Sequence, residues 1–381
     1  MRKKKIIMKN PFVYGKEVTG ENFCNRRNEI NELCRDIENN QNVMIFSQRR
    51  FGKTSLIKEV LRKSHRKGII IVYADLYSVL SEEDFIRIYA EAIANSIFGK
   101  IHKKLNAIAS FFRKIRPKIS FNESGQPSFS IDIEKSELFP SVKDVIESLN
   151  RYINNKKKKA VVVFDEFQQL CHLKNDRIIK IIRTLTQSHK NISYIYMGSK
   201  KHLILDMFNN PNNPFYRSAK SFPLYKISDK ELSKFIKKRF ETTDKEISNK
   251  LIKDIILICD SHPYYIQYLC HILWEMTIDK KNLDKDILDN SLKLLLERES
   301  PTYEATMDLL TIKQRKALVA LSKAGPNDKV YSSDFLNRFN LGSASSFQRV
   351  MQSLIKKNLI DKESGKYFII DVFFKKWLSN L

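Results

Sequence analysis

A short run of residues that starts at Ser47 has the types and the spacing of a phosphate-binding loop. It matches the Walker A pattern GxxxxGK[ST], except that a serine stands at the first glycine position. Gly52 lets the backbone approach phosphate oxygens, Lys53 reaches the β and γ phosphates, and Thr54 offers its hydroxyl to Mg²⁺. The residues expected to hold a nucleotide here are Ser47, Gln48, Arg49, Arg50, Phe51, Gly52, Lys53, Thr54 and Ser55.

An acidic pair further along the chain has the form of a Walker B motif. The apolar run of residues 160–164 ends in Asp165 and Glu166. Asp165 would hold Mg²⁺, usually through water, and Glu166 would polarise the attacking water. An acidic pair after a strand is common at the start of a loop, but here it lies downstream of a Walker A motif. The two motifs together predict a P-loop NTPase with its own catalytic glutamate.

Ser199 and Arg217 are further candidates for catalysis, and each has an ordinary alternative. Ser199 follows the apolar run of residues 192–198, where a hydroxyl would sense the γ-phosphate; otherwise it caps the next helix. Arg217 is either an arginine finger for the site of a neighbouring copy or a surface residue paired with an acid. Both alternatives stay open for each residue.

The elements that must position these residues form an α/β pattern. Helical spacing, as at residues 55–66, separates most of the short apolar runs. Such alternation predicts a P-loop type parallel sheet with helices on both faces. Pro223 restricts the last run to an edge strand. The five predicted strands are residues 43–47, 69–75, 160–165, 192–198 and 221–225.

The long connection between the second and third strands predicts an insertion. Residues 85–105 have helical spacing, and Ser81 is the expected N-cap before an acidic first turn. Alternating stretches at residues 118–121 and 128–133 flank a Gly-Pro-containing turn, which predicts a hairpin within an insertion of about residues 106–135. A helix at residues 141–154 leads to the third strand.

The remainder of the chain predicts a helical lid followed by a winged helix. Residues 228–299 show only helical periodicity, which is broken at Ser261-His262-Pro263. From about Leu310, three helices and a Gly-tipped hairpin follow in the winged-helix order. The predicted helices are residues 313–323, 332–339 and 343–357, and the strands are residues 359–362 and 366–370. The expected domains are residues 1–225, 226–305 and 306–381.

These residues together resemble the archaeal-type ATPase family, a branch of the signal-transducing (STAND) NTPases close to the AAA+ origin-recognition ATPases. The resemblance runs through nearly the whole chain and includes the paired arginines of the Walker A loop. Ser47 and Ser261 are departures, because the family has glycine at both positions. The segments that carry it are Asn10-Pro11-Phe12, Gly15, residues 23–30, 49–56, 164–168, 198–199, 214–217, 261–267 and 371–378.

The resemblance implies ATP and Mg²⁺ as cofactors and adds three residues to the site. Phe23 and Arg26 belong to a segment that would cradle adenine and ribose, and Pro263 would place the lid over the nucleotide. The matched segment 261–267 lacks a sensor arginine, so coupling of the lid would rely on Pro263 and packing. His262 is interpreted as a buried histidine rather than a catalytic one.

A formal net charge of +25 predicts an anionic partner. The alternative is that the charge reflects the codon composition of an AT-rich genome, with lysines spread over solvent-exposed faces. The winged helix would bring basic and polar residues to double-stranded DNA, although such domains also bind proteins or act as intramolecular lids. The residues it offers are Ser343, Ser345, Ser346, Gln348, Arg349, Lys356, Lys362 and Lys366.

The rest of the composition predicts a cytoplasmic protein with no membrane partner. The apolar stretch at residues 6–8 is too short for a signal peptide, and the five scattered cysteines suggest no disulfide or zinc framework. The sequence leaves three functions open. One is an ATP-hydrolysing switch that reports nucleotide state to the winged helix, and another is a DNA-binding regulator with structural nucleotide and negligible hydrolysis. A scaffold for a protein partner or for further copies of the chain is a third.

Overall fold

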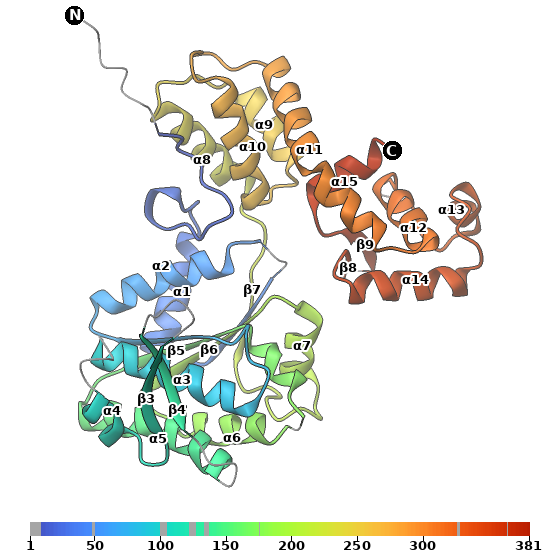
Figure 1. Ribbon diagram of the computed structural model, residues 1–381. Helices are drawn as coiled ribbons and strands as arrows, with labels where there is room; N and C mark the ends of the chain where they lie inside the picture. The colour runs from blue at the N-terminus through green and yellow to red at the C-terminus, as the bar shows by residue number, and fades with distance from the viewer. Residues whose placement is uncertain are drawn as a thin grey trace, which may run out of the picture. The chain divides into compact units, whose positions relative to one another are not determined.

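The computed structural model describes residues 9–47, 50–99, 105–121, 127–132, 137–174, 176–325, 328–363 and 365–381. It divides into two compact units (Figure 1). One unit is Arg26–Tyr225, and the other joins Lys226–Leu381 to the N-terminal segment that ends at Asn25. Among the described residues, no helix has the length and apolar character that crossing a bilayer requires.

A five-stranded parallel sheet is the centre of the Arg26–Tyr225 unit. The strand order is β2-β5-β6-β1-β7, so the strand that leads into the Walker A loop lies between β6 and β7. β7 is at the edge, where its proline removes no ladder hydrogen bond that an inner strand would need. The strands are β1 Val43–Phe46, β2 Ile70–Asp75, β5 Ala160–Asp165, β6 Ile192–Gly198 and β7 Lys220–Pro223.

Helices cover both faces of this sheet (Figure 1), which confirms the predicted α/β class. Successive side chains of a strand point to opposite faces, and Phe164 and Tyr196 belong to the core on the side of α3, α5, α6 and α7. The opposite face carries α1 and α2, which pack against each other. The helices are α1 Arg27–Glu38, α2 Lys53–Arg66, α3 Glu82–Phe98, α5 Leu138–Asn155, α6 Arg177–Thr186 and α7 Lys201–Asn209.

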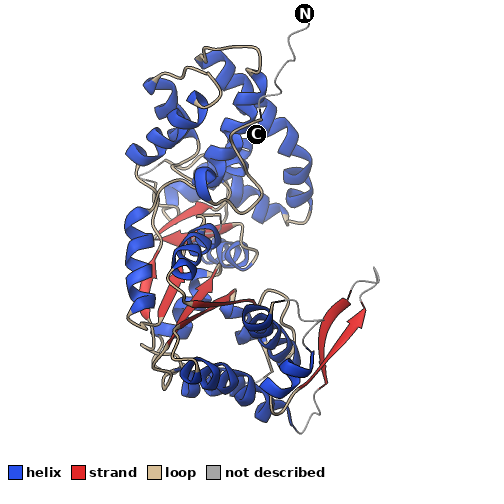
Figure 2. Cartoon of the chain, turned by 90° about the vertical axis from the view of Figure 1, so that its left-hand side faces the viewer, coloured by secondary structure: helices blue, strands red, loops and turns tan. Residues whose placement is uncertain are grey.

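The insertion between β2 and β5 contains a short helix and an antiparallel hairpin. Ser81 caps α3 as predicted, in a capping box with Asp84. The predicted helix 85–105 is too long, because α3 ends at Phe98 and its C-cap Gly99 has a φ of 70°. The hairpin is visible in Figure 2, and most of its predicted turn lies outside the described residues. The elements are α4 Leu105–Phe111, β3 Arg116–Phe121 and β4 Pro127–Asp132.

The other unit contains a helical part and the three helices and hairpin of the predicted winged helix. Pro263 occupies the first turn of α10, where its missing N–H costs nothing. The N-terminal segment of the same unit contains a short 3₁₀ turn, Gly20–Asn22. The helices are α8 Asp229–Glu241, α9 Asn249–Ile258, α10 Pro263–Met276, α11 Lys285–Asp308, α12 Ile312–Ser322, α13 Ser333–Arg338, α14 Ala344–Lys356 and α15 Val372–Ser379; the strands are β8 Ile360–Glu363 and β9 Lys366–Ile369.

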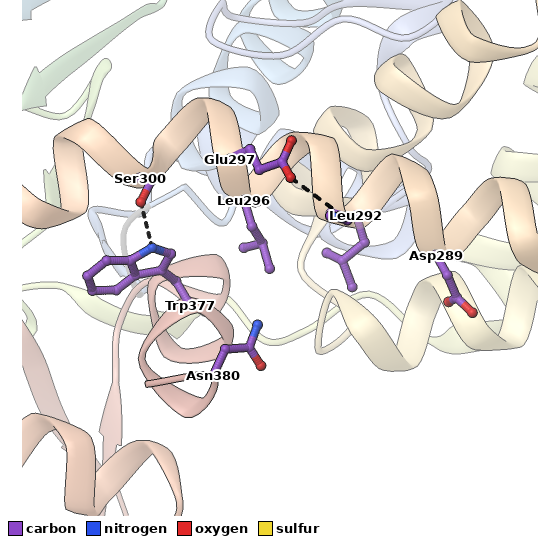
Figure 3. Close-up of a pocket in the computed structure, with 8 residues that line it drawn as sticks. Asp289, Leu292, Leu296, Glu297, Ser300, Trp377 and Asn380 are labelled. Carbon is purple, nitrogen blue, oxygen red and sulfur yellow. Dashed lines mark hydrogen bonds and ion pairs between the residues drawn. The ribbon is translucent and has the colours of Figure 1, made fainter.

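One continuous core joins the helical part to the winged helix. The ring of Phe373 on α15 lies 4.9 Å from that of Tyr265 on α10, and Phe374 lies 5.0 Å from Tyr303 on α11. Figure 3 shows the pocket beside this seam, where Trp377 Nε1 donates to Ser300 Oγ at 2.8 Å. The boundary placed after residue 305 by the sequence lies inside α11, which continues to Asp308.

Candidate functional site

The Walker A loop leads from β1 into the first turn of α2. Gly52 precedes the helix with a φ of 83°, a backbone conformation that a glycine adopts without strain. Lys53 is buried, and its Nζ donates to Ser47 Oγ at 3.3 Å. The serine that replaces the usual glycine therefore gives the lysine a polar neighbour. Gln48 and Arg49 lie outside the described residues, whereas Arg50, Phe51, Thr54 and Ser55 are described.

The amino end of α2 suits an anion. The first N–H groups of a helix lack intrahelical acceptors, and the helix dipole adds partial positive charge there. Lys53 and Thr54 are the first two residues of this helix. Backbone donors, a lysine and a hydroxyl therefore converge at the carboxyl edge of the sheet.

Asp165 ends β5 at the same edge, opposite Asp75 of β2. The hydroxyl of Tyr73 donates to Asp165 Oδ2, and the backbone N–H of Glu166 donates to Oδ1 at 2.9 Å. Burial raises the pKa of the Asp165 carboxyl, the charges of Glu166 and Asp75 add to the rise, and the Tyr73 hydrogen bond opposes it. The two hydrogen bonds fix the orientation of the Asp165 carboxylate.

Glu166 follows in a left-handed backbone conformation, with a φ of 53°. Its Oε2 accepts a hydrogen bond from Ser199 Oγ at 2.8 Å and another from Gln168 Nε2. The Ser199 hydroxyl is thus engaged with the acid, and α7 begins after Lys200 without a side-chain cap. The structure brings Lys53, Asp165, Glu166 and Ser199 to one edge of one sheet.

Gln168 is a contributor that the sequence did not single out. It is fully buried in the 3₁₀ helix Phe167–His172 that follows Glu166. A side chain on Gly198 would place its Cβ 2.6 Å from Gln168 Oε1 and 3.0 Å from Ile204 Cβ. Gly198 therefore makes the space in which Gln168 reaches Glu166. The only sequence signal was that Gln168 lies within a segment matching the family.

The residues present fit a divalent cation of the Mg²⁺ type. Thr54 and Asp165 supply a hydroxyl and a carboxylate, which are the oxygen ligands that Mg²⁺ takes. Among the described residues there is no cluster of three or more His, Cys, Asp or Glu side chains that could cage a metal. Mg²⁺ keeps several waters and shares its coordination with substrate phosphates, so a hydroxyl and a carboxylate are the kind of protein ligands that it takes.

Arg26, expected near adenine and ribose, is buried within the protein. Its Nη2 donates to the carbonyl oxygens of Phe51 and Tyr225, at 3.3 and 2.9 Å, and its Nη1 pairs with Glu29. These contacts make Arg26 a link between the Walker A loop and the chain that leaves β7. Its expected contact with the nucleoside stays a prediction.

Phe23 and Pro263 belong to the other unit. Phe23 is partly exposed just before that unit's boundary, and Pro263 begins α10. His262 is buried, with its ring 4.7 Å from the ring of Tyr265. The roles of Phe23 and Pro263 at the nucleotide stay predictions.

Arg217 lies at the opposite edge of the sheet from the Walker motifs. It is exposed three residues before β7 begins, and it stacks over the Tyr216 ring at 5.2 Å. Because all five strands are parallel, the start of β7 is at the amino edge, whereas Lys53 and Glu166 follow carboxyl ends. Arg217 is therefore placed away from the phosphate loop of its own sheet.

The winged helix presents one polar face of α14. Phe347, Met351 and Leu354 point into the core. Ser343 caps the helix by accepting a hydrogen bond from Ser346 N at 3.3 Å. The exposed residues of α14 and of the hairpin include Ser345, Gln348, Arg349, Gln352, Lys356, Lys362 and Lys366.

Fold and site together define a P-loop NTPase joined to a winged helix, and family models agree. The model for an ATPase domain predominantly from Archaea matches residues 23–269, well over half of the chain. A model for a probable winged helix domain matches residues 301–380. The chain belongs to this archaeal ATPase family, which confirms the predicted family and the enzyme class of an ATPase.

Individual relatives are distant. Two uncharacterized ATP-binding proteins of Methanocaldococcus jannaschii are 27% identical over 159 residues and 26% identical over 176 residues. These matches cover 39% and 43% of this chain, and it spans less than half of either relative, 44% and 47%.

Solved structures with the same fold cover almost the whole chain. A Walker-type ATPase of Pyrococcus abyssi has a TM-score of 0.63 at 19% identity, and the match covers 97% of this chain and 99% of that one. The ORC2 protein of Aeropyrum pernix, in ADPNP and ADP complexes, has a TM-score of 0.56 at 14% identity, with 93% of each chain covered. At these identities the likeness shows the fold alone.

Proposed function

We propose that this chain is an ATP-binding and ATP-hydrolysing switch that passes its nucleotide state to the winged helix, which acts on double-stranded DNA. The observation that carries the proposal is the placement of Glu166. Its carboxylate is held by Ser199 and Gln168 at the sheet edge to which β1 delivers Lys53. A carboxylate held in this way is positioned to orient a water for attack on a terminal phosphate.

Each residue at this edge has a distinct part in the proposal. Lys53 and the amino end of α2 bind the phosphates, and Ser199 links the terminal phosphate to Glu166. Thr54 and Asp165 would hold Mg²⁺, which when bound would supply positive charge to the phosphate oxygens. Ser47 keeps Lys53 in place within the loop.

Coupling is supported by the way in which the winged helix is attached. α11 runs from the helical part into the winged helix, and α15 packs back on α10 and α11 through Phe373 and Phe374. A change in the helical part would therefore carry the winged helix with it. Because Arg217 lies away from its own phosphate loop, it would serve as an arginine finger only for another copy.

The test is the steady-state ATPase rate of the wild type and of Glu166→Gln, each with and without duplex DNA. We expect hydrolysis by the wild type, stimulation by DNA, and little hydrolysis by the variant. Lys53→Ala should lose nucleotide binding. A wild type that neither binds nor hydrolyses ATP, with Lys53→Ala behaving identically, would remove the proposal.

The polar face of α14 favours a second candidate, a DNA-binding regulator in which nucleotide is structural. The exposed Gln348, Arg349 and Lys356 lie along one side of α14, and an α-helix is an element that the major groove admits. This candidate predicts salt-dependent duplex binding that Glu166→Gln leaves untouched. Failure to bind any nucleic acid at low salt would favour a scaffold for a protein partner instead.

A further inference from the structure

Tyr225 is an exposed aromatic residue beside the phosphate loop. Its side chain is 72% exposed, although most large aromatic residues of the same unit are buried. It follows edge strand β7, and β7 pairs with β1 up to Phe46 and Pro223. The hydrogen bond from Leu224 N to Phe46 O, at 3.0 Å, extends this pairing to the residue before Tyr225.

The backbone of Tyr225 is tied to the loop by a buried arginine. One nitrogen of Arg26, Nη2, donates to both Phe51 O and Tyr225 O. The bonds measure 3.3 and 2.9 Å, so the two carbonyl oxygens can be no farther apart than these lengths laid end to end. Arg26 is only 4% exposed, so this link is buried inside the protein.

The order of the strands determines the direction in which a nucleotide lies at this edge. Asp165 ends β5, Glu166 follows it and Ser199 follows β6, all on one side of β1. The terminal phosphate belongs on that side, within reach of Glu166. A nucleotide oriented in this way extends its nucleoside end to the opposite side of β1, where β7 is the last strand of the sheet in the described part of the chain, about 4.8 Å away. Tyr225 is the exposed aromatic residue at this position.

We propose that the ring of Tyr225 stacks on the nucleobase of the bound nucleotide. Every base presents a π face, so an exposed aromatic ring contributes affinity for nucleotides with little discrimination between bases. The proposal rests on the proposed function, because it requires the P-loop to bind the phosphates. Arg26 would then act on the base indirectly, by holding Tyr225 beside the loop.

A second tyrosine supplies a matched control. Tyr77 is 70% exposed and follows β2 at the same carboxyl edge, but β2 is the strand farthest from β7. It lies on the acidic side of the loop, beyond Asp165. A nucleotide oriented as proposed leaves Tyr77 without a role in base binding.

The experiment measures ADP affinity by calorimetry in the presence of Mg²⁺. We expect Tyr225→Ala to weaken ADP binding by about 5- to 150-fold, the loss typical of one base–aromatic stack. Tyr225→Phe keeps the ring and should bind like the wild type, and so should Tyr77→Ala. A diphosphate of 2-aminopurine riboside, at saturation, should be quenched by the wild type and by Tyr225→Phe but not by Tyr225→Ala.

Lys53→Ala separates the two levels of the proposal. If Lys53→Ala loses ADP and Tyr225→Ala binds it as tightly as the wild type, base stacking is wrong and the P-loop function stands. Equal weakening by Tyr77→Ala and Tyr225→Ala also overturns the stacking role. If the wild type binds no ADP, or Lys53→Ala binds it unchanged, the proposed function fails as well.

Discussion

At the scale of single residues, the contacts of Glu166 predict how hydrolysis depends on Gln168. Replacing Gln168 by leucine keeps the buried volume but removes one of the two donors to the catalytic carboxylate. A hydrogen bond to a charged group contributes about 1.5–3 kcal/mol, so we expect kcat to fall about 10- to 150-fold. ADP affinity should stay close to that of the wild type, because Gln168 contacts Glu166 and lies outside the Walker A loop. Steady-state ATPase assays and calorimetry measure both.

Gly198→Ala is an independent control for the same contact. The new methyl group would meet Gln168 Oε1 at 2.6 Å and Ile204 at 3.0 Å, so the amide must move. The variant should therefore lower kcat in the same direction without altering residue 168. A Gln168→Leu protein that hydrolyses ATP at the wild-type rate would show that Ser199 alone suffices to hold Glu166.

The candidate site shows which contacts a sequence can predict. Lys53, Thr54, Asp165 and Glu166 stand in motifs whose spacing is dictated by phosphate chemistry, so their places could be predicted one by one. Tyr73 and Gln168 could not, because their partners depend on which strand ends meet. Tyr73 reaches Asp165 across the β2–β5 pair, although 92 residues separate the two in the chain. Nothing in the sequence alone identifies Tyr73 as a neighbour of Asp165.

At the scale of elements, His189 predicts a pH-dependent contact among α5, α6 and β6. Burial lowers the pKa of His189 below 6.5, and the hydrogen bond to Glu147 opposes this only in part. A depressed pKa means that the unfolded chain binds the proton more readily, so the free energy of unfolding falls as pH drops below about 6.5. The loss is at most about 1.4 kcal/mol per pH unit.

Chemical denaturation of the wild type and of His189→Gln between neutral and mildly acidic pH tests this contribution. The variant is expected to be less stable at neutral pH, because His189 also bonds to the Tyr194 hydroxyl at 2.7 Å. Its stability should nevertheless change less with pH than that of the wild type. Parallel pH profiles would mean that His189 titrates normally in the folded state.

The attachment of the winged helix predicts the effect of a change in α15. Phe373 is 1% exposed and packs against Tyr265 and Tyr268. Its replacement by alanine should cost about 3–5 kcal/mol of unfolding free energy, from lost burial and from the cavity left behind. Thermal and urea unfolding of the full chain measure the loss. Leu309→Ala is the control, because Leu309 is 79% exposed and should change stability little.

The elements themselves were largely predictable where one signal was dominant. Apolar runs that are buried on both faces predicted β5 and β6 to the residue, and Ser81 predicted the start of α3. Helical periodicity located the end of the helical part less well: the boundary predicted after residue 305 lies inside α11, which continues through Pro301 to Asp308. Tertiary packing explains the difference. Trp377 donates a hydrogen bond to Ser300, and the ring of Tyr303 packs against the ring of Phe374, so both contacts stabilise the helical turns around the proline.

At the scale of the whole molecule, the proposed switch requires the nucleotide and the DNA to affect each other equally. If ATP changes duplex affinity by some factor, duplex DNA must change ATP affinity by that same factor. Coupling energies between sites are typically 1–3 kcal/mol, so we expect about a 5- to 150-fold change in each direction. Glu166→Gln is the protein to use, because slowed hydrolysis keeps ATP bound during both titrations. Phe373→Ala should reduce this change in affinity in both directions, because it removes the packing of α15 against Tyr265 and Tyr268 on α10.

The salt dependence of duplex binding distinguishes binding by the winged helix from the general attraction of DNA to a basic protein. With a formal net charge of +25, the protein should bind duplexes at low salt whatever its nucleotide state. Arg349→Ala on the exposed face of α14 should weaken duplex binding and make the salt dependence shallower by about one unit if Arg349 contacts phosphate. The same change at Lys158, an exposed lysine of the ATPase unit, should have little effect on either quantity. Fluorescence anisotropy over a salt series measures both, and equal effects at the two positions would mean that charge alone, and no winged-helix surface, holds the DNA.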